Sequence, residues 1–368
     1  MDNQLLYKIA ISFIPKIGPV NAKKLIAYVG SLEGVFKEKK RILVKIPGIG
    51  ETLAKIIIKN NVIEEAKREI EFINKYNLKT YFFLDKDYPN RLKECYDSPI
   101  LLYMKGDVDL NNSKIISIIG TRKATDYGKS ICDKLITDIN ARGHNPVIVS
   151  GLAYGIDVQA HKSALNNNFK TIAVLGHGLN LIYPVAHSSV AKDIIKNGGL
   201  LTEFKSNSKN DKGNFVRRNR IIAGMSDATI VVESAKKGGA LITADIANSY
   251  NRDVFAFPGN INNKYSEGCN RLIKSHKAAL IESVADLEYI LGWEQNKKPK
   301  AIQTKIFNEL STEEKTIVNL LKKDDKLNID IIRIKTELSI SKISALLLNL
   351  EFNGIVKSLP GKVYGLIK

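Results

Sequence analysis

The chain is poor in cysteine and has no long hydrophobic run. Among its 368 residues, Cys95, Cys132 and Cys269 lie far apart and form no CxxC pair, which argues against a zinc site and against a disulfide framework. No run approaches the roughly 18 apolar residues that a membrane span needs, and the first residues lack the pattern of a signal peptide. We therefore expect a protein of the reducing cytoplasm with neither a membrane span nor a bound metal.

Negative charge is also in short supply. The chain has 38 Asp and Glu residues against 56 Lys and Arg residues, a formal net charge of +18. Such an excess attracts polyanions, including nucleic acids. A generally lysine-rich proteome would produce the same excess, so the position of the charges along the chain is more informative than their sum. The length itself predicts two or three domains.

The pattern of residues 1–80 predicts short helices joined by two similar turns. Residues 14–18 (IPKIG) and 46–50 (IPGIG) each place a proline-containing turn and a glycine before a helix start. This pattern resembles a tandem helix-hairpin-helix (SAM-like) unit, in which backbone N–H groups approach a DNA phosphate. The other interpretation is a small helical bundle that acts as a spacer or contacts a protein. The first interpretation predicts secondary contacts with the DNA backbone through Gly18, Gly48 and Gly50.

Residues 81–292 alternate short apolar runs with helical stretches. The runs are rich in Ile and Val and continuously apolar, which is typical of strands buried on both faces of a parallel sheet. Alternating strands and helices predict an α/β fold with a doubly wound, mostly parallel sheet, whose ligands bind at the carboxyl edge. The expected strands lie at 114–120, 145–151, 170–176, 198–204, 228–234 and 253–259.

The last part of the chain predicts a linker and a small domain. Residues 293–305 are polar, as linkers often are. In residues 306–368, a helix capped at Ser311 or its neighbour precedes a second amphipathic helix, and a hairpin then turns at residues 360–361. This order predicts a winged helix, which binds either duplex DNA or a protein. Because the expected recognition helix carries only Lys342 as a cation, we favour a protein contact.

Four loops that would follow strands are basic or rich in glycine. Residues 120–123 end the first strand of the series; residues 214–220 place three arginines, an asparagine and a phenylalanine within seven positions; residues 236–239 and 268–274 add two helix starts. Cations and glycine turns hold phosphates, and bases stack on aromatic rings, so these loops predict a site for single-stranded DNA. The candidate residues are Gly120, Thr121, Arg122, Lys123, Phe215, Arg217, Arg218, Asn219, Arg220, Lys236, Lys237, Gly238, Gly239, Asn270, Arg271 and Lys274.

Known nucleotide-binding motifs fit poorly. The GKS triplet at 128–130 resembles the end of a phosphate-binding P-loop, but Lys123 stands where that motif needs glycine, and a helix has already begun at the triplet. Gly176 and Gly178 follow a strand, yet Leu181 occupies the place of the third glycine of a dinucleotide fingerprint. The residues therefore favour neither a P-loop nor a dinucleotide-binding fingerprint.

Catalytic patterns are equally weak. Asp157 and His161 share one helical face, and we interpret them as a pair on a helix surface. Glu203 and Glu233 end strands, but the paired carboxylates of a two-metal nuclease are missing. We therefore expect that the chain is not an enzyme.

Several long motifs occur in the order found in the DprA/Smf family. They are SIIGTRKATDYG, VSGLAYGIDVQAHKSAL, TIAVLGHGLNLIYP, NFVRRNRIIAGMSDATIVVES, GGALITADIA, NRDVFAFPGNI and GCNRLIKSHKA, within about residues 80–292. The resemblance implies an extended Rossmann-like fold that binds single-stranded DNA without a nucleotide cofactor. It also implies protection of incoming DNA during natural transformation, help in loading the RecA recombinase, and a homodimer.

The chain departs from the family pattern at several positions. Val216 stands where proline is usual, Ala240 where serine is frequent, and Tyr154 where arginine is common. The resemblance implies that these changes retune the loops, or exchange a phosphate contact for stacking, without removing the cations. Two alternatives stay open: a hydrolase acting on a small nucleotide, with Glu233 or Asp245 as acid or base, and a central dimerisation scaffold flanked by DNA-binding terminal domains.

Overall fold

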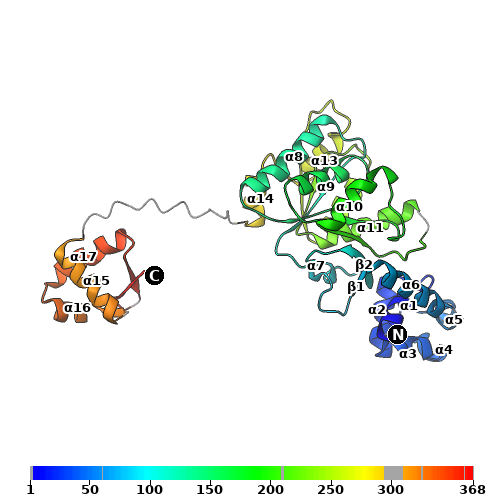
Figure 1. Cartoon of the computed structure of the whole chain (residues 1–368), viewed down its shortest axis with the longest axis horizontal. Helices are drawn as coiled ribbons and strands as arrows, with labels where there is room; N and C mark the ends of the chain where they lie inside the picture. The colour runs from blue at the N-terminus through cyan, green and yellow to red at the C-terminus, as the bar shows by residue number, and fades with distance from the viewer. Residues whose placement is uncertain are drawn as a thin grey trace. The chain divides into compact units, whose positions relative to one another are not determined.

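The computed structural model describes residues 3–59, 61–208, 211–293, 310–324, 326–359 and 361–367. The chain forms two compact units, Met1–Lys297 and Lys298–Lys368. The larger unit holds a central sheet surrounded by helices, and the smaller one is a separate small domain (Figure 1).

Among the described residues of the larger unit, nine strands form one sheet in the order β1-β2-β6-β5-β4-β3-β7-β8-β9. Strands β3 to β9 pair in parallel, whereas β2 pairs antiparallel with β6, and β1 with β2. The predicted mostly parallel, doubly wound sheet is confirmed, and each predicted strand is present. The strands are β1 Lys79–Phe82, β2 Leu101–Gly106, β3 Ile115–Ile119, β4 Val147–Ser150, β5 Thr171–Val174, β6 Gly198–Thr202, β7 Ala228–Val231, β8 Asp253–Ala256 and β9 Ala279–Leu280.

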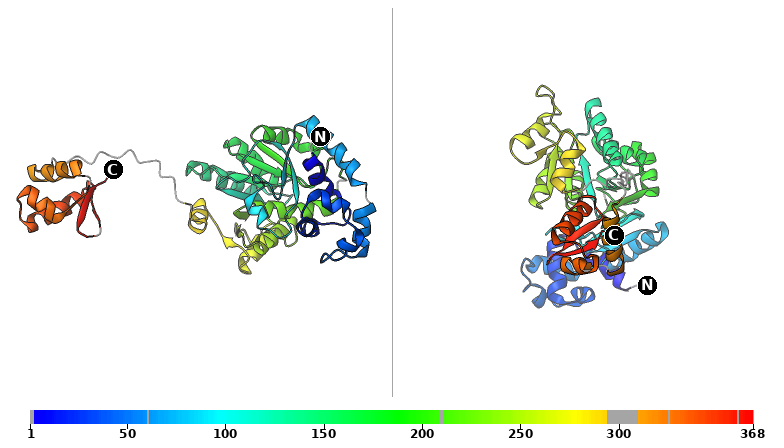
Figure 2. Two further views of the ribbon diagram at one scale, coloured as in Figure 1. Left: turned by 90° about the horizontal axis from the view of Figure 1, so that it is seen from below. Right: turned by 90° about the vertical axis from the view of Figure 1, so that its left-hand side faces the viewer.

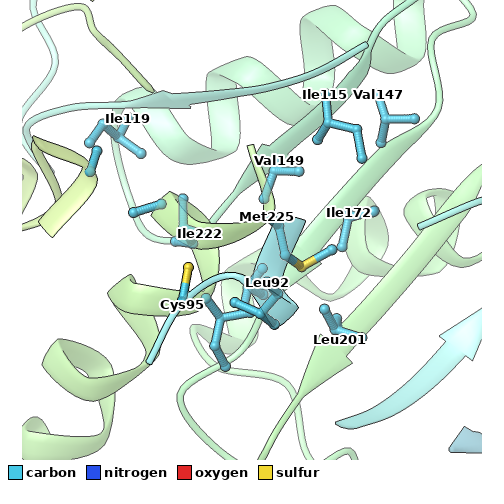
Figure 3. Packing of buried hydrophobic residues seen from close by; sticks show 14 of the residues in the cluster. Leu92, Cys95, Ile115, Ile119, Val147, Val149, Ile172, Leu201, Ile222 and Met225 are labelled. Atoms are coloured by element: carbon cyan, nitrogen blue, oxygen red, sulfur yellow. The ribbon is translucent and has the colours of Figure 1, made fainter. Parts of the chain in front are cut away.

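Alternate residues of each strand face opposite helical layers. Ile115 and Ile119 of β3 belong to one buried cluster, and Ile116 and Ile118 to another, as the two-residue period of a strand requires. Figure 3 shows part of the first cluster, in which Ile222 of the helical layer lies over the sheet. That layer contains α7 Asn90–Lys93, α11 Lys212–Met225, α12 Gly239–Ser249 and α13 Glu267–Lys274; the opposite layer contains α8 Asp126–Ala141, α9 Ile156–Asn166, α10 Ser188–Lys196 and α14 Val284–Leu291.

The N-terminal helices lie at one end of the larger unit (Figure 2). Their buried cluster is continuous with Phe82, Leu101 and Tyr103 of β1 and β2, so the helices pack directly on the antiparallel edge of the sheet. The predicted boundary after residue 80 falls inside β1 and stays a prediction. The helices are α1 Asn3–Phe13, α2 Pro19–Val29, α3 Leu32–Lys37, α4 Lys40–Leu43, α5 Glu51–Lys59 and α6 Val62–Tyr76.

The smaller unit has the predicted winged-helix fold. Ser311 caps its first helix reciprocally: the Glu314 N–H donates to Ser311 Oγ, and the Ser311 N–H donates to the Glu314 carboxylate. The sequence analysis missed α16, whose eight residues are too few for a clear helical period. The elements are α15 Thr312–Asp324, β10 Lys326–Asn328, α16 Ile329–Thr336, α17 Ile340–Phe352, β11 Val356–Leu359 and β12 Val363–Leu366, with strand order β10-β12-β11.

Three details bear on the predictions for the C-terminal part. Lys342 of the expected recognition helix α17 forms an ion pair with Glu313. Trp293, at the start of the predicted linker, packs in the larger unit with its ring 5.2 Å from that of His144. The rest of that linker, residues 294–305, and Pro360 of the predicted hairpin turn lie outside the described residues.

The strand order reverses beside β3. The chain builds outward from β3 through β4 and β5 to β6, and helix α11 then returns it to the other side of β3, where β7 begins. In open α/β sheets such a reversal leaves a crevice at the carboxyl ends of the two strands, because their connections run in opposite directions. The loops after β3 and β7 are therefore the place to look for a ligand site.

Candidate nucleic-acid interface

A cavity of about 490 Å³ opens beyond the carboxyl ends of β3 and β7. Two of the four predicted loops, residues 120–123 and 236–239, contribute to its wall. Residues 214–220 also contribute, but the prediction of a loop there is wrong, because they lie within helix α11. The cavity is therefore built by segments more than one hundred residues apart in the sequence. The predicted site residues that line it are Gly120, Thr121, Arg122, Phe215, Arg218, Asn219, Lys237, Gly238 and Gly239.

The loop after β3 carries Arg122 and is fastened to the end of β7. The Thr121 N–H donates to the Glu233 carbonyl over 2.8 Å. The buried Glu233 carboxylate also accepts hydrogen bonds from the N–H and the hydroxyl of Thr125, at 2.9 and 2.6 Å. Glu233 thus holds the loop in place rather than serving as a free acid, and Arg122 is presented on a braced turn.

Positive charge at the cavity is free for a ligand. The side chains of Arg122, Lys212 and Lys237 are exposed and line the cavity. Within the part of the chain that the structure describes, none of the three forms an ion pair. Because exposed cations without a carboxylate partner attract anions strongly, this side of the cavity suits phosphate groups.

The N-terminus of α12 is also suited to bind a phosphate group. Its N-cap, Gly238, has extended backbone geometry and, among the described residues, no side chain caps the helix. The first N–H groups of a helix lack intrahelical acceptors and carry partial positive charge, so they bind phosphate oxygens well. A Cβ added at Gly239 would meet no atom within 4 Å, which leaves the helix start open to a ligand.

The floor of the cavity contains the buried pair Asp157 and Arg218. The Arg218 guanidinium donates to the carbonyls of Gly151, at 2.8 Å, and Val174. Burial lowers the pKa of Arg218 to about 10. Burial also raises the pKa of the Asp157 carboxyl, against the opposing effects of Arg218 and of backbone N–H groups of Ala153 and Gly120. These contacts tie the loop ends to α11.

The sequence-based interpretation of Asp157 and His161 as a helix-surface pair is wrong. Both residues are buried, because α9 presents that face to the sheet. His161 Nδ1 lies 2.7 Å from Thr171 Oγ1, and burial lowers the pKa of the imidazole to about 3. The pattern of two polar residues four apart cannot by itself distinguish a solvated face from a buried one.

An aromatic pair occupies another part of the cavity wall. The rings of Phe215 and Tyr183 have centroids 5.7 Å apart and planes inclined by 48°. A Cβ added at Gly176, just beyond β5, would lie 2.8 Å from Phe215 Cδ1, so the absence of a side chain there lets the Phe215 ring pack closely. Half-exposed rings of this kind can stack on a base.

Comparison with known proteins identifies the family of the chain. Residues 79–291 match the model of the family described as DNA recombination-mediator protein A. The chain belongs to that family. Residues 305–362 match the DprA winged helix domain, and residues 9–60 a SAM-like helix-hairpin-helix tandem. The DprA/Smf resemblance and the predicted fold class are therefore confirmed.

This family member is similar to one relative over nearly its whole length. It is 34% identical to Protein Smf of Synechocystis over 99% of each sequence, and 41% identical to DNA processing protein DprA of Streptococcus pneumoniae over 56% of this chain and 72% of that one. The X-ray structure of the pneumococcal DprA has a TM-score of 0.63 at 32% identity, covering 78% of this chain and 98% of that one.

A second solved structure concerns nucleic acid directly. It is described as giving insight into the single-stranded DNA binding mode of DNA processing protein A from Helicobacter pylori. Its TM-score with this family member is 0.52 at 30% identity, and the match covers 59% of this chain and 96% of that one.

The arginine-rich motif divides between two faces of α11. Phe215, Arg218 and Asn219 line the cavity, whereas Arg217 and Arg220 bind the Glu203 carboxylate at 2.9 and 2.5 Å. Arg220 is buried and also donates to the Asp97 carbonyl. The helical period of 3.6 residues explains the division, because positions i, i+3 and i+4 share a face.

The remaining candidates lie outside the cavity wall. Asn270 exchanges hydrogen bonds with the backbone of Gly259, at 3.1 and 2.9 Å, and so braces the loop after β8. In the N-terminal turns, an added Cβ at Gly18 or Gly50 would meet no atom within 4 Å, while one at Gly48 would lie 3.1 Å from Asn21 Oδ1. DNA contact by any of these residues stays a prediction, as it does for the exposed side chains of Lys123, Lys236, Arg271 and Lys274.

Asp157, Tyr183 and Lys212 are among the cavity residues that the sequence analysis did not place in the site. Tyr183 lies in the quoted motif TIAVLGHGLNLIYP, and Lys212 opens the helix of the arginine-rich motif, so nearness to those motifs was the available signal. Among the described residues, no helix meets the length and apolarity needed to cross a membrane, and no group of three or more His, Cys, Asp or Glu side chains could hold a metal ion.

Proposed function

We propose that this chain binds single-stranded DNA in the cavity beyond β3 and β7 and acts there as a recombination mediator without catalysing a reaction. In this proposal it protects incoming DNA during natural transformation and helps load the RecA recombinase onto the strand. It works as a cytoplasmic homodimer and needs no nucleotide cofactor. Family membership and the described DNA-binding mode of the Helicobacter pylori relative support this choice.

The observation that carries the proposal is that the cavity wall presents both positively charged groups and aromatic rings. Arg122, Lys212 and Lys237 and the open start of α12 supply positive charge, while Phe215 and Tyr183 supply ring faces. A single strand offers both a phosphate backbone and unpaired bases, so it can use both kinds of group. In a duplex the bases are paired and stacked inside the helix, so only its phosphates could interact with the cavity, through the cations.

The test is fluorescence anisotropy with labelled oligo-dT and with a duplex, over a salt series. Wild type should prefer the single strand. Arg122→Ala should lower the affinity about tenfold, and it should reduce the slope of log K against log salt by about 0.7, the value expected when one phosphate of a single strand is no longer neutralised. The matched control is Arg68→Ala on α6, which removes the same charge from an exposed position outside the cavity.

Two results would contradict the proposal: preference for the duplex, or equal affinities for Arg122→Ala and Arg68→Ala. If the proposal holds, RecA filament nucleation on protein-coated single strands measures loading, nuclease digestion measures protection, and light scattering measures the homodimer. Point variants are the better test of the reading in which the terminal domains bind DNA. Deleting residues 1–80 would expose the side chains of Phe82, Leu101 and Tyr103, which are buried against the N-terminal helices. We expect this exposure to destabilise the rest of the larger unit.

A hydrolase acting on a small nucleotide is a second candidate, favoured by one observation. The cavity volume of about 490 Å³ suits one nucleotide, and the Asp157 carboxylate lies in its wall. This carboxylate already accepts backbone hydrogen bonds and faces Arg218. These contacts make it a structural group rather than a carboxylate available to accept a proton from a substrate. Incubation with nucleoside monophosphates tests the hydrolase activity. Release of the free nucleobase by wild type, and its loss in Asp157→Asn, would support this activity.

A further inference from the structure

Two of the exposed cations of the cavity, Arg122 and Lys237, lie on one side of its rim, here called its cationic half, and two tyrosines lie on the other, its aromatic half. Another exposed cation, Lys212, lies one helical turn before Phe215 on α11. In the sheet, β5, β4, β3 and β7 are consecutive neighbours. Arg122 follows β3 and Lys237 follows β7, whereas Tyr154 follows β4 and Tyr183 follows β5. Since parallel strands end at the same edge, strand order alone separates the two cations from the two tyrosines. The tyrosines are also among the exposed large side chains, at 47% and 44%.

The two tyrosine-bearing loops are joined to each other. His187, in the short 3₁₀ turn Val185–His187, donates from Nδ1 to the Leu152 carbonyl over 2.8 Å. The His187 ring also meets the Tyr154 ring edge to face, with centroids 4.8 Å apart and planes at 68°. The loop after β5 therefore supports the ring of Tyr154 as well as carrying Tyr183, which itself contacts Phe215.

Tyr154 also lies close to the cationic half. Its neighbour Ala153 lines the cavity, and its other neighbour, Gly155, is so close to the β3 loop that an added Cβ would lie 2.1 Å from the Thr121 carbonyl oxygen and 2.7 Å from the Arg122 carbonyl carbon. The backbone at Tyr154 is thus held beside the turn that presents Arg122. We expect a DNA strand whose phosphate contacts Arg122 to place its bases near Tyr154.

We propose that Phe215, Tyr183 and Tyr154 form an aromatic track on which successive bases of a single strand stack, so that the binding site extends out of the cavity along the loops after β5 and β4. This inference rests on the proposed binding of single-stranded DNA and specifies how the strand runs. Phosphates follow the cationic half and bases follow the aromatic half. Stacking makes the track tolerant of sequence, because every base has a flat ring face.

The experiment uses the full chain and an oligo-dT series of increasing length, with 2-aminopurine placed at successive positions. Tyr154→Leu should lower affinity about fivefold or more for the longer oligonucleotides, which is the effect of losing one stacked base. It should leave the shortest ones nearly unchanged, and it should remove 2-aminopurine quenching at one position outside the cavity. Tyr154→Phe retains the ring and should bind like wild type, while Tyr154→Trp should quench more strongly.

The control is Tyr289→Leu on α14, a tyrosine that is 88% exposed and does not line the cavity. If Tyr154→Leu binds every length like wild type while Arg122→Ala loses affinity, the track is wrong and DNA binding in the cavity stands. If wild type does not bind oligo-dT, the proposed function fails and the track fails with it. Should Tyr154→Leu lose stability, the unchanged binding of Tyr154→Phe and the stronger quenching of Tyr154→Trp still decide the matter; wild-type quenching in Tyr154→Trp would overturn the track.

Discussion

Replacing Gly155 by alanine probes the packing that presents Arg122. Gly155 is the N-cap of α9, with φ of 78° and ψ of −126°, a backbone conformation that residues with a Cβ adopt only at a cost of about 1–3 kcal/mol. The new Cβ would also lie 2.1 Å from the Thr121 carbonyl oxygen. That atom belongs to the backbone, so the turn itself must move by about 1 Å to restore normal contact.

The two effects together predict a loss of about 3 kcal/mol or more in the free energy of unfolding. At about 2–4 °C per kcal/mol for a large domain, the larger unit should melt about 6 °C or more below wild type in scanning calorimetry. Because the displaced turn carries Arg122, the affinity of the folded variant for oligo-dT should fall nearly as far as that of Arg122→Ala.

The matched control is Gly239→Ala, the same chemical change at another glycine of the cavity. There the Cβ meets no atom within 4 Å and the φ angle is not positive. Its melting temperature should equal that of wild type or rise slightly, since glycine is a poor helix former. A Gly155→Ala protein that melts within about 1–2 °C of wild type and binds DNA normally would refute the described packing of Gly155 against the β3 turn.

Two further predictions concern stability. Burial lowers the pKa of His161 from 6.5 to about 3. Between these two pH values the imidazole is therefore protonated in the unfolded chain but neutral in the folded chain. The free energy of unfolding should then fall with decreasing pH by up to about 1.4 kcal/mol per unit, down to about pH 3. In His161→Asn, whose amide can still donate to Thr171, chemical denaturation over a pH series should show a slope shallower by up to one proton; an unchanged slope would contradict the assignment. The second prediction concerns the loop that leads into α11. The buried Glu69 carboxylate of α6 accepts from the N–H and hydroxyl of Ser206, at 2.9 and 2.7 Å. Glu69→Ala should cost about 2–4 kcal/mol in urea unfolding because it leaves a buried N–H without its acceptor. Glu65→Ala, which removes only an exposed ion pair with Lys205, should cost under about 1 kcal/mol, and equal losses in the two variants would count against the buried contact.

Local patterns along the chain were enough to predict the class of fold. Continuous runs such as those around β3 and β7 are long and apolar enough to require burial on both faces, and the intervening helical periods leave a doubly wound sheet as the solution. The strands β1, β2 and β9 were not foreseen. Strand β9 has only two residues, and β1 and β2 owe their pairing to an edge of the sheet that no local pattern reveals.

The positions of the site loops were likewise predictable from the sequence. Gly120 and Arg122 directly follow one buried strand, and Lys237 and Gly238 follow another, so parallel strand ends bring them to a common edge whatever the strand order. The order was still needed to show that β3 and β7 are neighbours, which places these residues around one cavity rather than at separate points along the sheet.

The sequence by itself therefore determined the fold class and the segments of the chain that carry the charge. Only the tertiary structure decided which charges are free. Arg217 and Arg220 pair with Glu203, Arg218 is buried beside Asp157, and Arg122 stays without an ion-pair partner among the described residues. The physical reason is that periodicity and propensity act over a few neighbouring residues, whereas the partner of a charged side chain is set by packing between segments distant in the sequence.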